Sequence, residues 1–364
     1  MKKPIATVRT PFQNLKFLII LNKLLGLLSC KLVNGRFKES SVWGRGYCAL
    51  WLLFHCAYSS YFYYTMYMAT PAEKAEKLFA LGIVRFSAFF ISLLPYNYLG
   101  VFRSQDFIMF SEKLEAYDDK ATALGHQRKD KHIFTWLYFA YTFSTIFIKT
   151  YNILNSSIPE GREMIVTQTF ETVIPTICGT YCVFISAIFL DLIRQRFRHL
   201  NEVIVPYVSE LPVTGLKGEI TVYDVRYLHG VLIDSAGLIN RMYGIGTLLT
   251  FGSILLEFIS VIYLFITDVQ DNATVILLDL LFQTIYLFAM YHCATYEANR
   301  VEERVLKYGL SFKNSKCRMD KIEMMLYFYH NRFTFTAAEF FIIDLTILLP
   351  IASTVSTYLT LIIN

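Results

Sequence analysis

The last 32 residues of the chain, residues 333–364, read FTFTAAEFFIIDLTILLPIASTVSTYLTLIIN. A helix that crosses a bilayer needs about 20 predominantly apolar residues, so this segment is long enough to span one. Its polar residues recur at steps of seven, four, three and four, and on a helix they form one stripe: Thr346, Ser353, Thr357, Thr360 and Asn364. A helix surrounded by lipid on all sides would not favour such a stripe.

Two interpretations of the stripe follow from membrane chemistry. Small hydroxyl residues let helices approach closely, so the stripe can serve helix packing. It can also line a pore, in which several copies of the helix turn their polar faces toward shared water. Pro350 lies in the middle of the segment, and a kink or a break of the helix is expected there because proline removes a backbone hydrogen bond.

Composition places the chain in a membrane. Of its 364 residues, 55% are hydrophobic, 16% are aromatic and only 17% are charged, whereas about a quarter of the residues of soluble proteins are charged. The mean hydropathy is +0.42. The aromatic excess fits belts at the membrane interfaces and an aromatic-lined cavity. The predicted fold class is therefore an all-α membrane protein.

Seven segments are predicted to be transmembrane helices: 47–68, 78–102, 132–154, 165–190, 246–267, 274–296 and 333–364. They divide the chain into three parts. Residues 1–46 form a cytoplasmic N-terminal region with a short interfacial or docked helix, residues 47–332 a six-helix ligand-sensing bundle, and residues 333–364 a pore-lining seventh helix. The polar block at 103–131 carries charges at helical spacing, which predicts that helices extend beyond the bilayer on the cytoplasmic side.

Positive charge predicts the orientation of the chain. Twenty-nine Lys and Arg residues lie before the first span or after the second, fourth and sixth spans, whereas the loops on the other side hold only Lys74, Lys77 and Arg162. By the positive-inside rule the N-terminus is cytoplasmic and the C-terminus extracellular. Two glycosylation candidates, Asn155 and Asn272, fall in predicted outer loops.

Several function classes find no support. A G-protein-coupled receptor would face the other way and would carry an Asp-Arg-Tyr-like triplet after its third span, and that triplet is missing. Histidines and cysteines show no metal-ligand spacing, and the chain has neither a glycine-rich phosphate loop nor a nucleophile elbow. We therefore expect no enzyme, no metal and no cofactor. The basic blocks border membrane ends, which suits lipid headgroups and not nucleic acid.

Short motifs carry a family resemblance. The C-terminal TYLTLII-Asn364, which begins at Thr357 and Tyr358, closely resembles the TY-x5-QF signature that ends insect gustatory receptors. Three further stretches look like the same family: RQRFRHLNE with Phe197 and Asn201, HGVLIDSAGLINRMYG before the fifth span, and HCATYEANRVEERVLKYGLSF after the sixth. The chain departs from the signature at its end, where Asn364 stands in place of the glutamine and no phenylalanine follows.

The resemblance implies a ligand-gated, non-selective cation channel in the plasma membrane of a chemosensory neuron. The implied assembly is a homotetramer, or a heteromer with related subunits, that passes monovalent and divalent cations when a small-molecule tastant binds. The pore and gate residues then lie on the last helix: Ser353, Thr357, Thr360, Leu361 and Asn364. Leu361 would form an apolar constriction beside a polar ring, or would only pack between helices. The alternatives are an odorant-receptor-like channel subunit, a G-protein-coupled receptor or a transporter.

Ionisable residues inside five spans predict the ligand pocket. They lie at similar depth in the outer halves of the spans: Arg85, Lys149, Glu171, Glu257 and Asp279. Such residues are costly in a membrane and face water or a partner, so a shared outward-open cavity explains them. The alternative is that the two cations pair with the carboxylates and hold the bundle together. Polar and aromatic residues at the same depth complete the predicted pocket: Tyr151, Asn152, Gln168, Tyr263 and Gln283.

Overall fold

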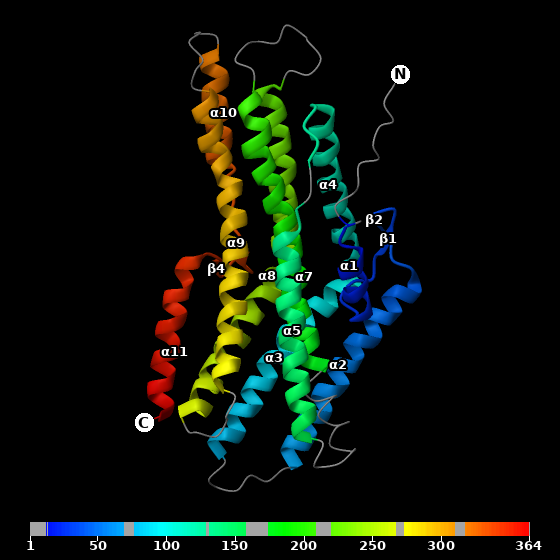
Figure 1. Cartoon of the computed structure of the whole chain (residues 1–364), viewed down its shortest axis with the longest axis vertical. Coiled ribbons are helices and arrows are strands. Elements are labelled where there is room, and N and C mark those ends of the chain that lie inside the picture. Colours follow the sequence, from blue (N-terminus) through cyan, green and yellow to red (C-terminus); the bar gives the residue numbers. More distant parts are fainter. Residues whose placement is uncertain are drawn as a thin grey trace.

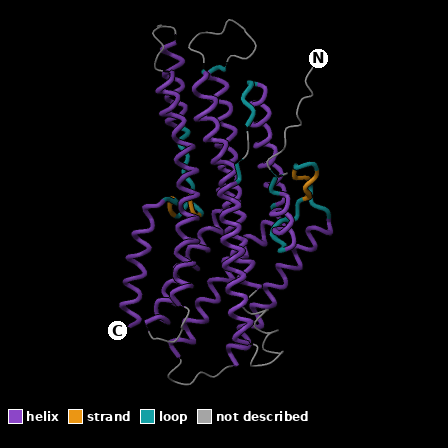
Figure 2. The backbone as a smooth tube through the Cα atoms, in the orientation of Figure 1, coloured by secondary structure: helices purple, strands orange, loops and turns teal. Residues whose placement is uncertain are grey.

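The structure is a computed structural model that describes residues 12, 14–68, 76–128, 131–157, 174–208, 220–266, 273–309 and 317–363. Helices dominate it, and the strands form two small hairpins (Figure 2). The α-helices are α1 (Lys16–Leu24), α2 (Val42–Met68), α3 (Glu76–Phe102), α4 (Ser104–Ala123), α5 (Ile133–Ser157), α7 (Ile174–His199), α8 (Val222–Ile266), α9 (Ala273–Gly309), α10 (Cys317–His330) and α11 (Leu348–Ile363).

The remaining elements are short. A π-helix, η4 (Leu200–Ile204), and a 3-10 helix, η5 (Val205–Tyr207), continue α7, and a second 3-10 turn, η6 (Leu345–Ile347), precedes α11. One antiparallel hairpin pairs β1 (Lys31–Val33) with β2 (Arg36–Lys38), and the other pairs β3 (Thr336–Ala337) with β4 (Phe341–Ile342).

The first six predicted spans correspond to α2, α3, α5, α7, α8 and α9. Three described stretches are long and apolar enough to cross a membrane, at Ile177–Tyr207, Val222–Tyr263 and Ile276–Val305, and two shorter apolar helices lie at Ile133–Ile148 and Leu345–Thr360. The start of the fourth predicted span, before α7, lies outside the described residues. The short N-terminal helix is α1, and its buried Leu18 and Ile19 dock it onto the hydrophobic core.

The last helix begins later than predicted. Residues 333–347 do not form a continuous helix, because the β3–β4 hairpin and η6 precede α11, which starts only at Leu348. Phe335 and Ala337 are buried, whereas Thr334 is exposed and Thr336 is half-buried, and this alternation is typical of a strand. Pro350 therefore sits in the first turn of α11, where the missing N–H costs little. The segment is interrupted just before Pro350, at the start of α11, and not by a kink in the middle of a continuous helix.

The helices form an elongated bundle with two halves (Figure 1). The half that we call the apolar half holds α2, α3, α5 and α11 with the adjoining parts of α7, α8 and α9. The polar half holds α4, α10 and the remainder of those three long helices. The 45 residues of α8 make a rod of about 68 Å, more than twice the roughly 30 Å of a bilayer core. This length agrees with the prediction that helices extend beyond the membrane.

Ion pairs fasten α4 to α8 in the polar half. Residues 106, 113 and 120 lie seven apart on α4 and so share one face of the helix. Each one meets an α8 residue of opposite charge, with N–O distances of 3.2, 2.8 and 2.6 Å: Asp106–Arg241, Lys113–Asp234 and Lys120–Asp224. Because the α8 partners run backward along the chain, the three pairs set the two helices antiparallel.

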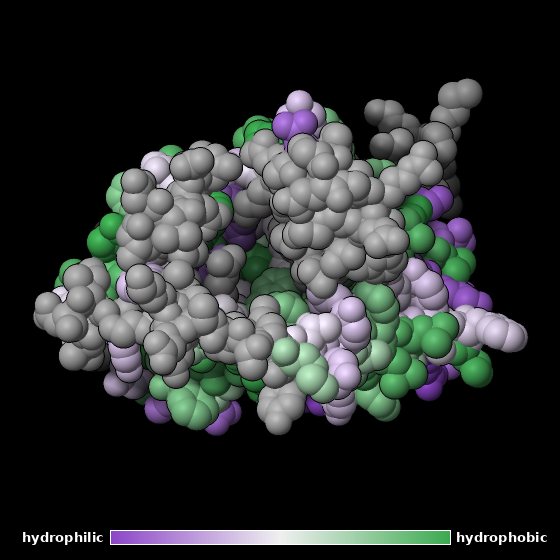
Figure 3. Space-filling model, turned by 90° about the horizontal axis from the view of Figure 1, so that it is seen from below, coloured by the Kyte–Doolittle hydropathy of each residue, from purple (hydrophilic) through white to green (hydrophobic). Residues whose placement is uncertain are grey.

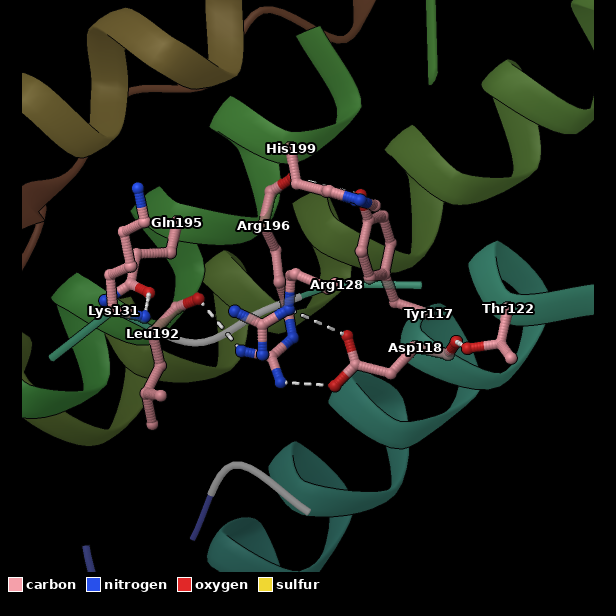
Figure 4. Close-up of polar contacts among 9 residues, drawn as sticks. All are labelled: Tyr117, Asp118, Thr122, Arg128, Lys131, Leu192, Gln195, Arg196 and His199. Carbon is pink, nitrogen blue, oxygen red and sulfur yellow. Dashed lines mark hydrogen bonds and ion pairs between the residues drawn. The ribbon is translucent and has the colours of Figure 1, made fainter. Parts of the chain in front are cut away.

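A buried carboxylate fastens α4 to α7 (Figure 4). The Asp118 carboxylate accepts from Arg196 Nη2 at 2.6 Å and from Arg128 Nε at 3.2 Å. The Arg196 side chain is 0% exposed, and its Nη1 also donates to the Leu192 carbonyl at 3.0 Å. Burial alone would raise the pKa of Asp118, but the two guanidinium groups outweigh it and hold this pKa below its usual value. The carboxylate therefore stays ionised at neutral pH.

We predict that Asp118→Asn destabilises the protein by about 3–5 kcal/mol at pH 7, because it breaks a buried ion pair. A depressed carboxyl pKa adds stability above the unfolded-state pKa of about 3.9, and this stability is lost as the pH falls through the folded-state pKa. Thermal unfolding of the detergent-purified protein between pH 7 and pH 3 should thus show the two curves converging in acid. Asp234→Asn, at a site 63% exposed, is the control. A stability difference between the wild type and Asp118→Asn that does not change with pH would contradict the prediction.

Candidate functional site

A buried carboxylate near the start of α9 joins this helix to α5. Asp279 is 4% exposed. The Tyr141 hydroxyl on α5 donates to its Oδ1 at 2.9 Å, and Gln283 Nε2, one turn further along α9, donates to its Oδ2 at 3.0 Å. Both carboxylate oxygens are thus hydrogen-bonded, as a buried charge requires.

Aromatic rings extend from Tyr141 across α5, α9 and α7. The Tyr141 and Phe282 ring centroids are 3.9 Å apart, and Tyr138 stacks on Tyr286 at 3.8 Å with an interplanar angle of 2°. Phe184 on α7 lies 5.6 Å from Tyr138. We call Asp279 and these rings of α5, α7 and α9 the aromatic cluster. Apolar and aromatic walls with a few placed polar groups are typical of small-molecule sites.

The apolar half is hollowed at its free end. Seen from the end at which α11 finishes, the surface has a recess near its centre, and the described side chains visible at its floor are largely hydrophobic, with hydrophilic ones at its edge (Figure 3). This recess opens on the side of the bundle where the sequence predicts an outward-facing ligand cavity.

The structure brings together only part of the predicted pocket. Of the predicted residues, Asp279 and Gln283 meet in the aromatic cluster. Tyr151 is 61% exposed on α5, and Glu257 and Tyr263 are half-buried on α8. The other predicted residues are not placed: Gln168 and Glu171 lie outside the described residues, and the side chains of Arg85, Lys149 and Asn152 are not described.

The sequence analysis does not predict the tyrosines of the aromatic cluster as site residues. Tyr138 and Tyr141 are three apart on α5, and Phe282 and Tyr286 are four apart on α9, so each pair shares one helix face. That spacing was the available signal. It does not reveal which helix faces meet, and this contact is what turns Tyr141 into the partner of Asp279.

The polar stripe of α11 faces away from its own subunit. α11 packs on α8 through a face that includes Val355, which is 8% exposed. Ser353 and Thr357 lie two residues to either side of Val355, about 200° around the helix, and they are exposed, as is Thr360. The hydroxyls of Thr357 and Thr360 donate to carbonyls four residues earlier, at 3.0 and 2.9 Å. Their hydrogens are thereby used within the helix, and their oxygens remain able to accept.

Two further residues of the predicted gate are not placed. The side chain of Leu361 is not described, and Asn364 lies outside the described residues. Tyr358 of the family motif is 52% exposed. Of the glycosylation candidates, Asn155 is exposed at the end of α5, and Asn272 lies outside the described residues.

Two asparagines hold the connection between α10 and α11. Asn299 on α9 accepts from the Phe333 backbone N–H at 2.8 Å and donates to the Phe333 carbonyl at 2.8 Å. Asn240 on α8 accepts from the Thr336 N–H at 2.9 Å and donates to its Oγ1 at 3.1 Å. We call this pair the amide clamp. Gly244, one turn further along α8, lets the hairpin approach, because a Cβ there would lie 3.2 Å from the Ala338 nitrogen.

The three further stretches that resemble the family meet in the polar half. Phe197 on α7 is fully buried, with its ring 6.0 Å from the ring of His229 on α8. Asn201 Nδ2 in η4 donates to the Glu297 carbonyl at 2.8 Å and to its carboxylate at 3.0 Å. The three stretches thus pack together, although about 100 residues separate Asn201 from Glu297.

These features together define a multi-pass membrane protein built as a helical bundle. The chain belongs to the 7tm chemosensory receptor family, whose model matches residues 15–364. This family is one of receptors and not an enzyme class. The resemblance predicted from the short motifs is therefore confirmed at the level of the chemosensory receptor family, and so is the all-helical membrane fold.

The fold is also similar to solved structures of the insect olfactory receptor OR5 from Machilis hrabei. Two of them, one determined in complex with eugenol, match with a TM-score of 0.68 over 96% of this chain and 97% of that chain, at 12% and 13% sequence identity. At such identities the likeness concerns the fold. No curated protein sequence matches the chain.

We predict that Tyr141→Phe lowers the free energy of unfolding by about 1.5–3 kcal/mol, the worth of a hydrogen bond to a charged group. The variant keeps the ring and removes only the donor to Asp279. Thermal unfolding of the purified protein measures the change. Tyr151→Phe, which removes the hydroxyl of an exposed ring on the same helix, is the matched control, and an equal effect of both variants would refute the role of the bond.

Proposed function

We propose that this chain is a gustatory-type chemosensory receptor and a subunit of a tastant-gated, non-selective cation channel. The observation that carries the proposal is the polar stripe of α11, because Ser353, Thr357 and Thr360 face away from α8 and are exposed in a single chain. Lipid is a poor environment for such a face. Several copies that turn it toward a common axis would enclose water that monovalent and divalent cations can cross.

The proposed orientation places the polar half in the cytoplasm and the end of α11 outside the cell. Twenty-nine Lys and Arg residues lie on the side assigned to the cytoplasm, which follows the positive-inside rule. Successive helices of the apolar half run in alternating directions, and α11 runs in the same direction as α2 (Figure 1). This arrangement supports the proposal of an odd number of crossings, with the termini on opposite sides of the plasma membrane of a chemosensory neuron.

A homotetramer, or a heteromer with related subunits, supplies the several copies. The outer face of α10 carries an apolar stripe that is 47%, 41%, 52% and 60% exposed at Ile322, Met325, Leu326 and Tyr329. In the proposed orientation this stripe would face the cytoplasm, where exposed apolar patches mark interaction surfaces. In Figure 1, α10 and α11 border the same side of the bundle. A common axis along that side would bury the apolar stripe and enclose the polar one.

The amide clamp suggests how a ligand controls the pore. A tastant in the recess contacts the helices of the aromatic cluster, and α9 carries both Asp279 and Asn299. A ligand that binds one arrangement of α8 and α9 better than another shifts the population toward it by that difference in affinity. Because Asn240 and Asn299 attach the segment before α11 to α8 and α9, the last helix moves with these two helices.

An odorant-receptor-like subunit is the second candidate. The solved structures that match are those of an olfactory receptor, one of them with eugenol. The rings of Tyr138, Tyr141, Phe282 and Tyr286 likewise suit a small aromatic ligand with one polar group. A response to volatile phenols, and none to sugars, amino acids or bitter compounds, would favour this candidate over the gustatory one.

We predict tastant-evoked cation current in excised membrane patches from cells that express this chain, without GTP. Thr357→Val should lower the unitary conductance, because it removes an oxygen from the pore wall. Thr354→Val is the control, since Thr354 lies about a quarter turn from Val355 and is half-buried. A current that requires GTP would overturn the channel proposal. Equal conductance changes in both variants would contradict the proposal that α11 lines the pore.

We also predict that Asn299→Asp weakens the link between ligand and gate. The change keeps the acceptor for the Phe333 N–H but sets a carboxylate oxygen against the Phe333 carbonyl, 2.8 Å from the present donor. Losing the Asn299–Phe333 hydrogen bond, worth about 1 kcal/mol, shifts the opening equilibrium about five-fold. The maximal open probability should fall, and the unitary conductance should stay unchanged. Asn331→Asp, which loses an amide-to-carbonyl bond within the α10 end, should leave both unaltered.

A further inference from the structure

The β1–β2 hairpin places its cations on one face. The register pairs Lys31 with Lys38 and Val33 with Arg36, and cross-strand partners share a face of a hairpin. The other face carries Phe37, which is 4% exposed and packs in the core. The two lysines are directly opposite each other, an arrangement that destabilises a hairpin through charge repulsion. An anion between them would remove this cost.

A cavity of about 660 Å³ lies between this face and α4. Charged residues of both signs line it: Lys31, Arg36, Lys38, Glu39, Glu112 and Glu115. Arg36 Nε pairs with Glu115 Oε2 at 2.9 Å. Among the residues that the structure describes, the remaining two lysines and two glutamates form no ion pair, so the cavity is neutral overall and offers both a cationic and an anionic wall.

Exposed apolar side chains beside the cavity mark it as a membrane-surface site. α2 begins directly after the hairpin, and its Val42 and Trp43 are 86% and 88% exposed. The outward face of α1 carries Phe17, Ile20 and Leu24, which are 53%, 44% and 57% exposed. Tryptophan at a helix end and an amphipathic helix with exposed apolar residues both belong at the boundary of headgroups and acyl chains. Figure 1 shows the hairpin and α1 next to the start of α2.

We propose that this cavity binds the headgroup of phosphatidylethanolamine. The lipid phosphate lies between Lys31 and Lys38 and relieves their repulsion, while the primary ammonium donates hydrogen bonds to Glu39 and Glu112. The acyl chains then run along the exposed apolar residues of α1 and α2. A neutral cavity with separated charges fits a zwitterion better than an anionic headgroup, and a primary ammonium has the N–H donors that a choline lacks.

The site does not depend on channel activity. It needs only a chain in a bilayer with the hairpin at a headgroup layer, and the cytoplasmic leaflet follows from the orientation proposed above. The occupant is a lipid and not a soluble phosphate compound, because the apolar residues next to the cavity have no role for a ligand without acyl chains.

Native mass spectrometry of the full chain in detergent tests the proposal. The protein is mixed with equal amounts of phosphatidylethanolamine, phosphatidylcholine and phosphatidylglycerol that carry the same acyl chains. We expect the ethanolamine lipid to be retained preferentially. The Lys31→Gln/Lys38→Gln double variant should lose about ten-fold in its retention, the effect of one charge-assisted hydrogen bond. Lys307→Gln, at an exposed residue of the last turn of α9, should change nothing.

A second variant separates the two walls of the cavity. Glu112→Gln should abolish the preference for phosphatidylethanolamine over phosphatidylcholine. Binding of phosphatidylglycerol should be unchanged or stronger. Three results would overturn the proposal: equal retention of all three lipids by the wild type, equal loss in Lys307→Gln, or full displacement of the lipid by soluble phosphoethanolamine, which would assign the site to a soluble ligand. The wild-type preference alone decides the matter should a variant fail to fold.

Discussion

Hydrocarbon has no water to hydrogen-bond with peptide groups, and this constraint shapes the whole molecule. In the apolar half the described backbone is helical, and the buried Asp279 receives its hydrogen bonds from Tyr141 and Gln283. In the polar half, where we propose that water is available, the constraint relaxes. Ion pairs between α4 and α8, the π-helical turn η4 and two hairpins all occur there or at its border. The two halves thus use different interactions, and among the described elements the long helices α7, α8 and α9 run through both of them.

The two ends of the terminal segment have opposite surface chemistry. α10 exposes apolar side chains, whereas α11 exposes hydroxyl groups. Each surface is unfavourable in the environment that we propose for a single subunit, since one would face water and the other lipid. The association of subunits that we propose would remove both costs at once. The hydroxyls of α11 donate to their own backbone, so the stripe is polar without requiring fixed partners on the neighbouring helix.

Much of the fold could be predicted from the sequence, because long apolar runs and the distribution of Lys and Arg report directly on helices in a membrane. The start of α11 could not be predicted. The alternating Phe, Thr and Ala residues before it form a short strand, but their mean hydropathy is as high as that of a membrane helix. The candidate site was harder to predict. Asp279 was predicted as a pocket residue from its depth, but its partner Tyr141 depends on which faces of α5 and α9 meet. Asn240 and Asn299 lie within resemblance stretches, and their role appears only when the Phe333–Thr336 backbone comes beside them.

The chemistry of the amide clamp has a consequence for a sensor at a body surface. Asparagine amides have no proton to gain or lose between acidic and alkaline conditions, and as neutral groups they are little affected by ionic strength, whereas exposed ion pairs weaken as salt rises. In the proposed orientation the clamp lies at the cytoplasmic end of α11, and this joint to the last helix would therefore keep the same strength as the pH or ionic strength of the cytoplasm changes. Changes in acidity or salinity of the surroundings would reach the gate through other parts of the molecule, and the clamp itself would follow only the compound that is bound.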